Sequence, residues 1–201
     1  MINKRLSTII LCILFSGCCI RSSAPCFCSP PDPEIEAQAL SWISPFDAST
    51  DHIFEDENGI LDTLEIERIQ DTEWTGGEEC GTQGDREVAV LRSKSNNERL
   101  FSLSASQNVL VSFNLYEEPT SFIPGYLNTL GDEIIVFEEN SDGELDENFE
   151  WQGESLRVIK IACESTDTSC DDYKMKSFIV SESLGLLEYV DMNGLKWSRI
   201  N

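Results

Sequence analysis

The chain has 201 residues, of which 14 are Lys or Arg and 37 are Asp or Glu, so its formal net charge is −23. A chain this acidic repels the phosphates of nucleic acids, and we therefore expect no DNA or RNA partner. The length suits one domain with a sizeable hydrophobic core.

Residues 1–17 have the pattern of an export signal. Lys4 and Arg5 give it a positive start, and residues 6–15 form an apolar run that is too short to span a bilayer. Cleavage after residue 17 would remove two basic residues and no acidic one, which changes the formal charge from −23 to −25.

Cys18 follows Ser16 and Gly17, and this small-small-Cys ending is typical of a bacterial lipoprotein signal. We therefore expect Cys18 to carry the lipid and to anchor the chain in the cell envelope. Cys19 rather than Asp follows it, which favours the outer membrane, facing the periplasm. An ordinary secretory cleavage after Ala24 is the alternative, but Pro25 would then follow the cut.

Eight cysteines in an exported chain indicate an oxidising compartment and disulfide bonds. The best-supported pair is Cys163 with Cys170, because the polar residues between them could form a loop joining two strand-like runs. Cys80 would then pair with Cys26 or Cys28. A zinc site is the alternative, but the Cys-x-Cys spacing and the single histidine disfavour it. We expect no metal and no other cofactor.

Residues 18–33 are rich in Pro, Ser and Cys and predict a flexible tether, which would leave residues 34–201 as a single β-rich domain. Asp32 and Pro33 predict the start of one short helix that ends before Pro45. The apolar residues expected on one face of this helix are Ile35, Ala39, Leu40 and Ile43.

The chain after Pro45 predicts β-structure, because apolar and polar residues alternate in several short runs. The runs are 60–69, 87–92, 100–104, 108–115, 133–138, 156–162, 173–180, 186–190 and 196–200. Tight turns are expected at Asn58-Gly59, Asp142-Gly143 and Asn193-Gly194. About nine or ten strands joined by local hairpins predict an antiparallel meander that forms a sandwich or a partly open barrel.

Two acidic turns, around Asp56 and around Asp142, resemble fragments of calcium-binding loops. Each lacks a required ligand, because Phe54 occupies the leading position of the first loop and Phe149 the closing position of the second. We therefore interpret both segments as turns without a metal.

His52 is the only histidine, and no hydrolase motif accompanies it. We expect it on the surface or at a strand edge, and we expect a protein that is not an enzyme. Aromatic residues near predicted turns could line a binding surface, although most aromatics of a β domain belong to its core. The segment 117–126 predicts an exposed binding loop in which Phe122 and Tyr126 would contact a ligand.

Residues 41–66, with a Trp-x-x-Pro-Phe turn, a strand and an Asn-Gly turn, resemble the opening of small uncharacterised bacterial envelope lipoproteins. The ending, residues 181–200, is similar to a closing hairpin found in such proteins and in other exported β domains. The resemblance implies a fold and a location but no activity.

Two functions are compatible with these observations. The first is a lipid-anchored, non-enzymatic β domain that binds another envelope component, such as an envelope protein. The second is a periplasmic carrier whose curved sheet holds a lipid-like hydrophobic ligand, which would require a dry cavity.

Overall fold

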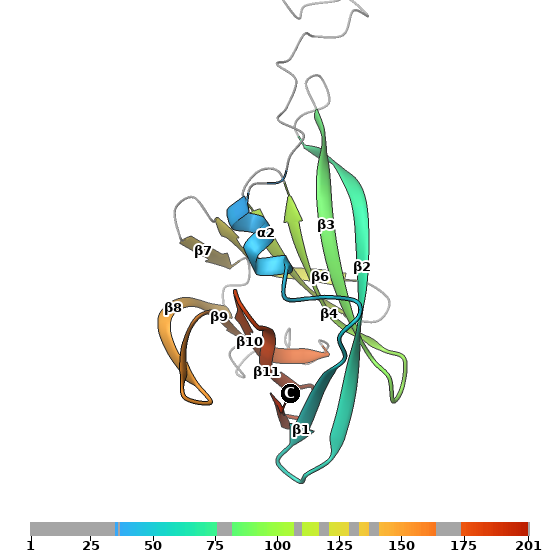
Figure 1. Cartoon of the computed structure of the whole chain (residues 1–201), viewed down its shortest axis with the longest axis vertical. Helices are drawn as coiled ribbons and strands as arrows, with labels where there is room; N and C mark the ends of the chain where they lie inside the picture. Colours follow the sequence, from blue (N-terminus) through green and yellow to red (C-terminus); the bar gives the residue numbers. More distant parts are fainter. Residues whose placement is uncertain are drawn as a thin grey trace, which may run out of the picture. The chain divides into compact units, whose positions relative to one another are not determined.

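Figure 1 shows a computed structural model of the chain, which describes residues 35, 37–75, 82–106, 110–116, 121–128, 133–136, 141–163 and 174–200. These residues form one short helix and twelve strands. The elements are α2 (Ala37–Ile43), β1 (His52–Asp56), β2 (Leu61–Thr75), β3 (Thr82–Ser93), β4 (Arg99–Ser106), β5 (Leu110–Tyr116), β6 (Ser121–Asn128), β7 (Glu133–Val136), β8 (Ser141–Trp151), β9 (Glu154–Cys163), β10 (Met175–Ser181), β11 (Gly185–Asp191) and β12 (Lys196–Arg199).

The chain divides into two compact units. The larger one consists of Asp32–Glu73 and Gly84–Asn201, and the smaller one of Met1–Pro31 and Trp74–Gln83. Within the smaller unit, the structure describes only the ends of β2 and β3. The fold described below is therefore that of the larger unit. The boundaries expected at residues 17 and 33 lie outside the described residues.

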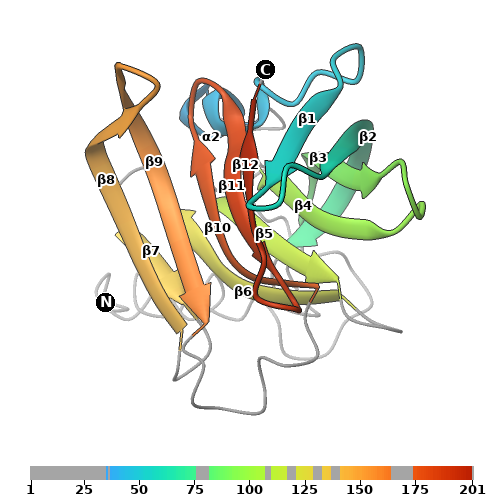
Figure 2. The same cartoon turned by 90° about the horizontal axis from the view of Figure 1, so that it is seen from below.

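All twelve strands belong to one sheet, in the order β7-β6-β5-β4-β3-β2-β1-β12-β11-β10-β9-β8. Strands that follow one another in the chain are neighbours in this order, except β7 and β8, which lie at its two ends. β1 pairs with β12, as between Phe54 and Arg199. The edge strands β7 and β8 lie beside each other, so the sheet curls into a nearly closed barrel (Figure 2). The predicted antiparallel meander is confirmed, in its partly open barrel form.

Aromatic side chains fill the interior of the curved sheet. Phe178 of β10 contacts Phe101 of β4 and Phe113 of β5, with ring centroids 4.9 Å and 5.6 Å apart. Because β10 is far from β4 and β5 in the strand order, these contacts cross the interior. Phe54 and Tyr189 add a second aromatic pair, 5.3 Å apart, from β1 and β11. The core at this level is therefore packed from wall to wall.

The short predicted helix is confirmed as α2, although it begins at Ala37, and the expected start at Asp32 lies outside the described residues. It buries Ala39, Trp42 and Ile43, a spacing of three and four residues that defines one helix face. Arg68 of β2 donates hydrogen bonds to the carbonyls of Ile43 and Phe46, at 2.9 Å and 3.0 Å. This guanidinium holds the end of the helix and the segment after it against β2, and the Ile43 carbonyl also accepts a hydrogen bond from the Phe46 amide, at 3.1 Å.

Two of the three predicted turns are confirmed, and they have the same construction. Gly59 and Gly194 have φ values of +78° and +82°, which favour glycine. In each turn the glycine amide donates to the carbonyl of the aspartate three residues earlier, at 3.1 Å for Asp56 and 3.0 Å for Asp191. The pattern is that of a hairpin with a glycine bulge.

The turn predicted at Asp142-Gly143 is wrong. Both residues lie within β8, where they pair with Ala162 and Ile161 of β9. The β8–β9 hairpin turns instead at Gln152 and Gly153, whose φ values are +50° and +89°. A continuous antiparallel partner strand holds the Asp-Gly pair extended, whereas Gln-Gly is not a recognised turn dipeptide.

The exposed loop predicted over residues 117–126 is also wrong from Ser121 onward, because these residues form β6 between β5 and β7. The pairing of β6 with β5 shifts register between Phe113 and Leu115, opposite the segment that contains Pro124. A bulge of this kind accommodates a proline, which has no amide hydrogen for the ladder. Twelve strands thus replace the nine or ten expected.

Candidate functional site

Most of the cysteines singled out from the sequence lie outside the described residues, namely Cys18, Cys26, Cys28, Cys80 and Cys170. Cys163 is the last residue of β9, and its backbone pairs with Ser141. Lipidation and the disulfide pairs therefore stay predictions.

The two predicted ligand-binding aromatics lie on β6. Tyr126 is half-buried and pairs with Ser112 of β5 and Ile135 of β7, so it is a mid-sheet residue. Phe122 pairs with Leu115 through the backbone. Strand pairing places them along one strand rather than on a loop, and their part in binding stays a prediction.

His52 differs from its predicted position. It begins β1, but only 1% of its surface is exposed, so it is a buried rather than a surface residue. Its ring lies 6.1 Å from that of Phe46, and its Nδ1 has no hydrogen-bond partner among the described residues. Burial, reinforced by the charge of Arg199, lowers the pKa of His52 from 6.5 to about 4, while Asp51 opposes the shift. A neutral, enclosed imidazole of this kind is a packing element.

The carboxylates of the two confirmed turns accept hydrogen bonds from backbone amides. Asp56 Oδ1 accepts hydrogen bonds from the amides of Asn58 and Ile60, at 2.9 Å and 2.7 Å. Burial alone would raise the pKa of Asp56, but these bonds hold it below its ordinary value. Asp191 Oδ1 likewise accepts from the amides of Asn193 and Leu195. Within the described part of the chain, no three metal-ligating side chains come together.

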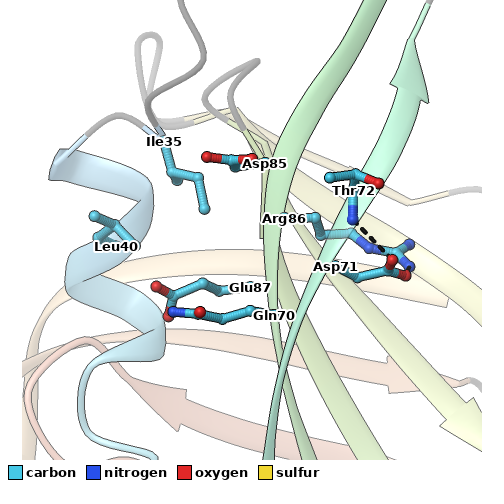
Figure 3. A pocket seen from close by; sticks show the side chains of 8 residues that line it. All are labelled: Ile35, Leu40, Gln70, Asp71, Thr72, Asp85, Arg86 and Glu87. Atoms are coloured by element: carbon cyan, nitrogen blue, oxygen red, sulfur yellow. Dashed lines mark hydrogen bonds and ion pairs between the residues drawn. The ribbon is translucent and has the colours of Figure 1, made fainter.

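The feature best suited to binding is a groove of about 600 Å³ between α2 and the strands β2 and β3 (Figure 3). We call it the helix–strand groove. Its lining residues are Ile35, Leu40, Gln70, Asp71, Thr72, Asp85, Arg86 and Glu87. This volume is within the range of pockets that hold small ligands or several side chains of a partner.

The groove has two chemically different walls. Ile35 and Leu40 are half-buried and pack against the core, and their remaining surface forms the apolar wall. Figure 3 shows Gln70, Asp85 and Glu87 on the side of β2 and β3 that faces this wall. Strand alternation explains the placement, because residues 85 and 87 point to the same face of β3.

The basic residues near the groove are already paired with acids. Arg86 reaches to the other side of the strands, where its Nη2 donates to Asp71 at 2.8 Å (Figure 3). A hydrogen bond from the Thr72 amide, followed by the bond from Arg86, lowers the pKa of Asp71. Arg68 forms an ion pair with Glu87. Asp85 is exposed, and its carboxylate has no hydrogen bond or ion pair within the described part of the chain.

A second hollow of about 600 Å³ adjoins the helix–strand groove. It shares Gln70 and Glu87 with the groove and extends along the segment after α2, where Ser44, Asp47 and Ala48 line it. Arg68, which holds this segment to the sheet, also lines this second hollow. An extended ligand could therefore occupy more than the groove itself.

Sequence reasoning did not single out this groove. It placed Ile35 and Leu40 on the buried face of the helix, and it did not pick out Asp85 or Glu87 among many carboxylates. The run Asp85-Arg86-Glu87, with like charges on alternate residues of a strand, was the available signal. These two carboxylates line a groove because α2 lies opposite them.

Comparisons of the chain with protein-family models, with curated proteins and with solved structures found no match. Among the described residues, no helix is both long enough and apolar enough to cross a membrane.

Proposed function

We propose that this protein is a lipid-anchored envelope protein whose β domain binds another envelope component through the helix–strand groove, without catalysing a reaction. The groove is the observation that carries this proposal, because it combines an apolar wall with carboxylates and an amide on the facing strands. Carboxylates can act as general acids or bases, but two of the three that line the groove, Asp71 and Glu87, form ion pairs with arginines.

The alternative function, a carrier of a lipid-like ligand, would use an apolar cavity inside the curved sheet. The contacts of Phe178 with Phe101 and Phe113 across the interior argue against such a cavity at their level. The helix–strand groove lies beside α2, on the same face of β3 as the core residues Ala89 and Leu91, and binding there requires no change in these aromatic contacts.

The anchor is tested by Cys18→Ala. The variant should lose palmitate labelling and leave the membrane fraction, either as uncut precursor or as released protein. A variant that still labels with palmitate and still partitions into detergent would show that Cys18 is not the anchor.

The binding role is tested by photo-crosslinking in intact cells. A benzophenone amino acid is placed at Gln70, an exposed groove residue of β2, and at Asp142, an exposed residue of β8, as the matched control. We expect a discrete adduct, identified by mass spectrometry, from position 70 alone. Its yield should fall when Leu40→Ala is added. No adduct, or equal adducts from both positions, would contradict the proposal.

A further inference from the structure

The carboxylates of the helix–strand groove outnumber its cationic groups. Asp71, Asp85 and Glu87 line it, against Arg86 alone. Arg68 of the adjoining hollow balances Glu87, and Arg86 balances Asp71. The carboxylate of Asp85 is left without a counterion among the described residues. The groove is thus locally negative, within a chain of net charge −23.

The apolar wall adds a second requirement for the ligand. A ligand that covers Ile35 and Leu40 must be apolar there, but it also removes water from the facing carboxylates. Desolvating a carboxylate without a compensating charge or hydrogen bond is costly, so a purely apolar ligand such as an acyl chain is disfavoured. An anionic ligand would be repelled.

Resting on the binding role proposed above, we propose that the groove takes a basic segment of a partner protein, with a lysine side chain against Ile35 and Leu40 and its ammonium beside Asp85. A lysine side chain has the required combination, since its methylene groups cover apolar surface while the charged end reaches polar groups. The long-range field of the acidic domain would also speed association with a basic partner.

The inference is tested by binding of fluorescent peptides to the full-length lipidated protein in non-ionic detergent. The probes are a short peptide that alternates lysine and leucine and its counterpart with glutamate in place of lysine. Unlabelled hexamethylenediamine serves as a competitor that supplies the ammonium without a peptide. We expect the lysine peptide alone to bind, with an affinity that falls as salt is added.

Two variants and one control locate the binding. Asp85→Asn removes the unpaired carboxylate and should weaken binding of the lysine peptide about threefold, a typical effect for an exposed charge pair. Leu40→Ala should weaken it about fivefold through lost apolar contact and leave its salt dependence unchanged. Asp142→Asn makes the same charge change on β8 and should leave the affinity unchanged. Equal effects of both Asp→Asn variants would show nonspecific attraction and overturn the inference.

The remaining outcomes separate this inference from the proposed function. Equal binding of the glutamate peptide, or full displacement by the diamine at the peptide's own affinity, would overturn the basic protein partner. The proposed function would survive if position 70 still gave its cross-link. Loss of that cross-link together with absent peptide binding would overturn both.

Discussion

Acidification is expected to destabilise the protein through its single buried histidine. The pKa of His52 is about 4 in the folded protein, because burial and Arg199 disfavour the imidazolium, and its ordinary value is 6.5. Each pKa unit corresponds to about 1.4 kcal/mol. Because His52 is 1% exposed, solvent screening is small, and the loss of stability between pH 7 and pH 4 should be about 3 kcal/mol.

The direction follows from which state binds the proton. Below pH 6.5 the unfolded chain protonates His52, whereas the folded protein does so only below about pH 4. The unfolded state therefore binds more protons in this window, and the free energy of unfolding decreases as the pH falls. Carboxylates with lowered pKa, such as Asp56 and Asp146, contribute to acid unfolding mainly near and below their ordinary value of 3.8. The pH range in which His52 lowers the stability can therefore be separated from the range in which these carboxylates do.

The assay is urea unfolding followed by tryptophan fluorescence at several pH values from 7 to 4. His52→Leu has a similar side-chain volume and cannot titrate, so its stability should change far less over this range. It also removes the unpartnered Nδ1, which should raise the stability at pH 7 by about 1 kcal/mol. The same pH dependence in wild type and His52→Leu would refute the assignment of the shift to this residue.

Three further predictions concern the fold. Gly185→Ala should lower the free energy of unfolding by about 2 to 3 kcal/mol, because φ is +79° and the new Cβ would lie 3.3 Å from Phe46. Gly194→Ala, with open space around it, should lower it by about 1 kcal/mol. Arg68→Ala should lower the free energy of unfolding by about 2 kcal/mol, because the carbonyls of Ile43 and Phe46 each lose one hydrogen bond and Glu87 loses its ion pair. Urea unfolding measures all three variants. Peptide mapping without reductant should find Cys163 joined to Cys170, a bond expected to contribute about 2 to 3 kcal/mol.

Each of these predictions has an outcome that contradicts it. Equal losses for the two glycine variants would mean that the contact with Phe46 does not matter. Arg92→Ala is the control for Arg68→Ala, since Arg92 forms a more exposed ion pair with Glu67, and a loss as large there would point to a general charge effect. Free thiols at both Cys163 and Cys170 in protein isolated without reductant would exclude their disulfide.

The sequence was a sufficient guide wherever structure depends on near neighbours. The alternation of apolar and polar residues at Phe101, Leu103 and Ala105 marks one buried face of β4 without any knowledge of its partners. Asn58-Gly59 and Asn193-Gly194 form the expected turns because a positive φ is a property of the glycine itself. The antiparallel meander follows from such strands and short connections.

Strand boundaries depended on partners that lie elsewhere in the chain. Asp142-Gly143 has the composition of a turn, yet it is extended because both residues pair with residues of β9. The segment with Pro124 is a strand because β5 and β7 flank it and a bulge accommodates the proline. In both places backbone hydrogen bonding to a neighbouring strand outweighed the local preference.

The burial of His52 and the helix–strand groove were decided by tertiary structure alone. His52 is enclosed because β1 pairs with β12 from the end of the chain, with Phe46 and Gly185 packed around the ring. The groove exists because α2 lies opposite the carboxylates of β3. Local sequence is enough to predict an export signal and to mark the strand pattern. Burial and charge pairing arise between residues that are distant in the chain, and only the fold brings such residues together.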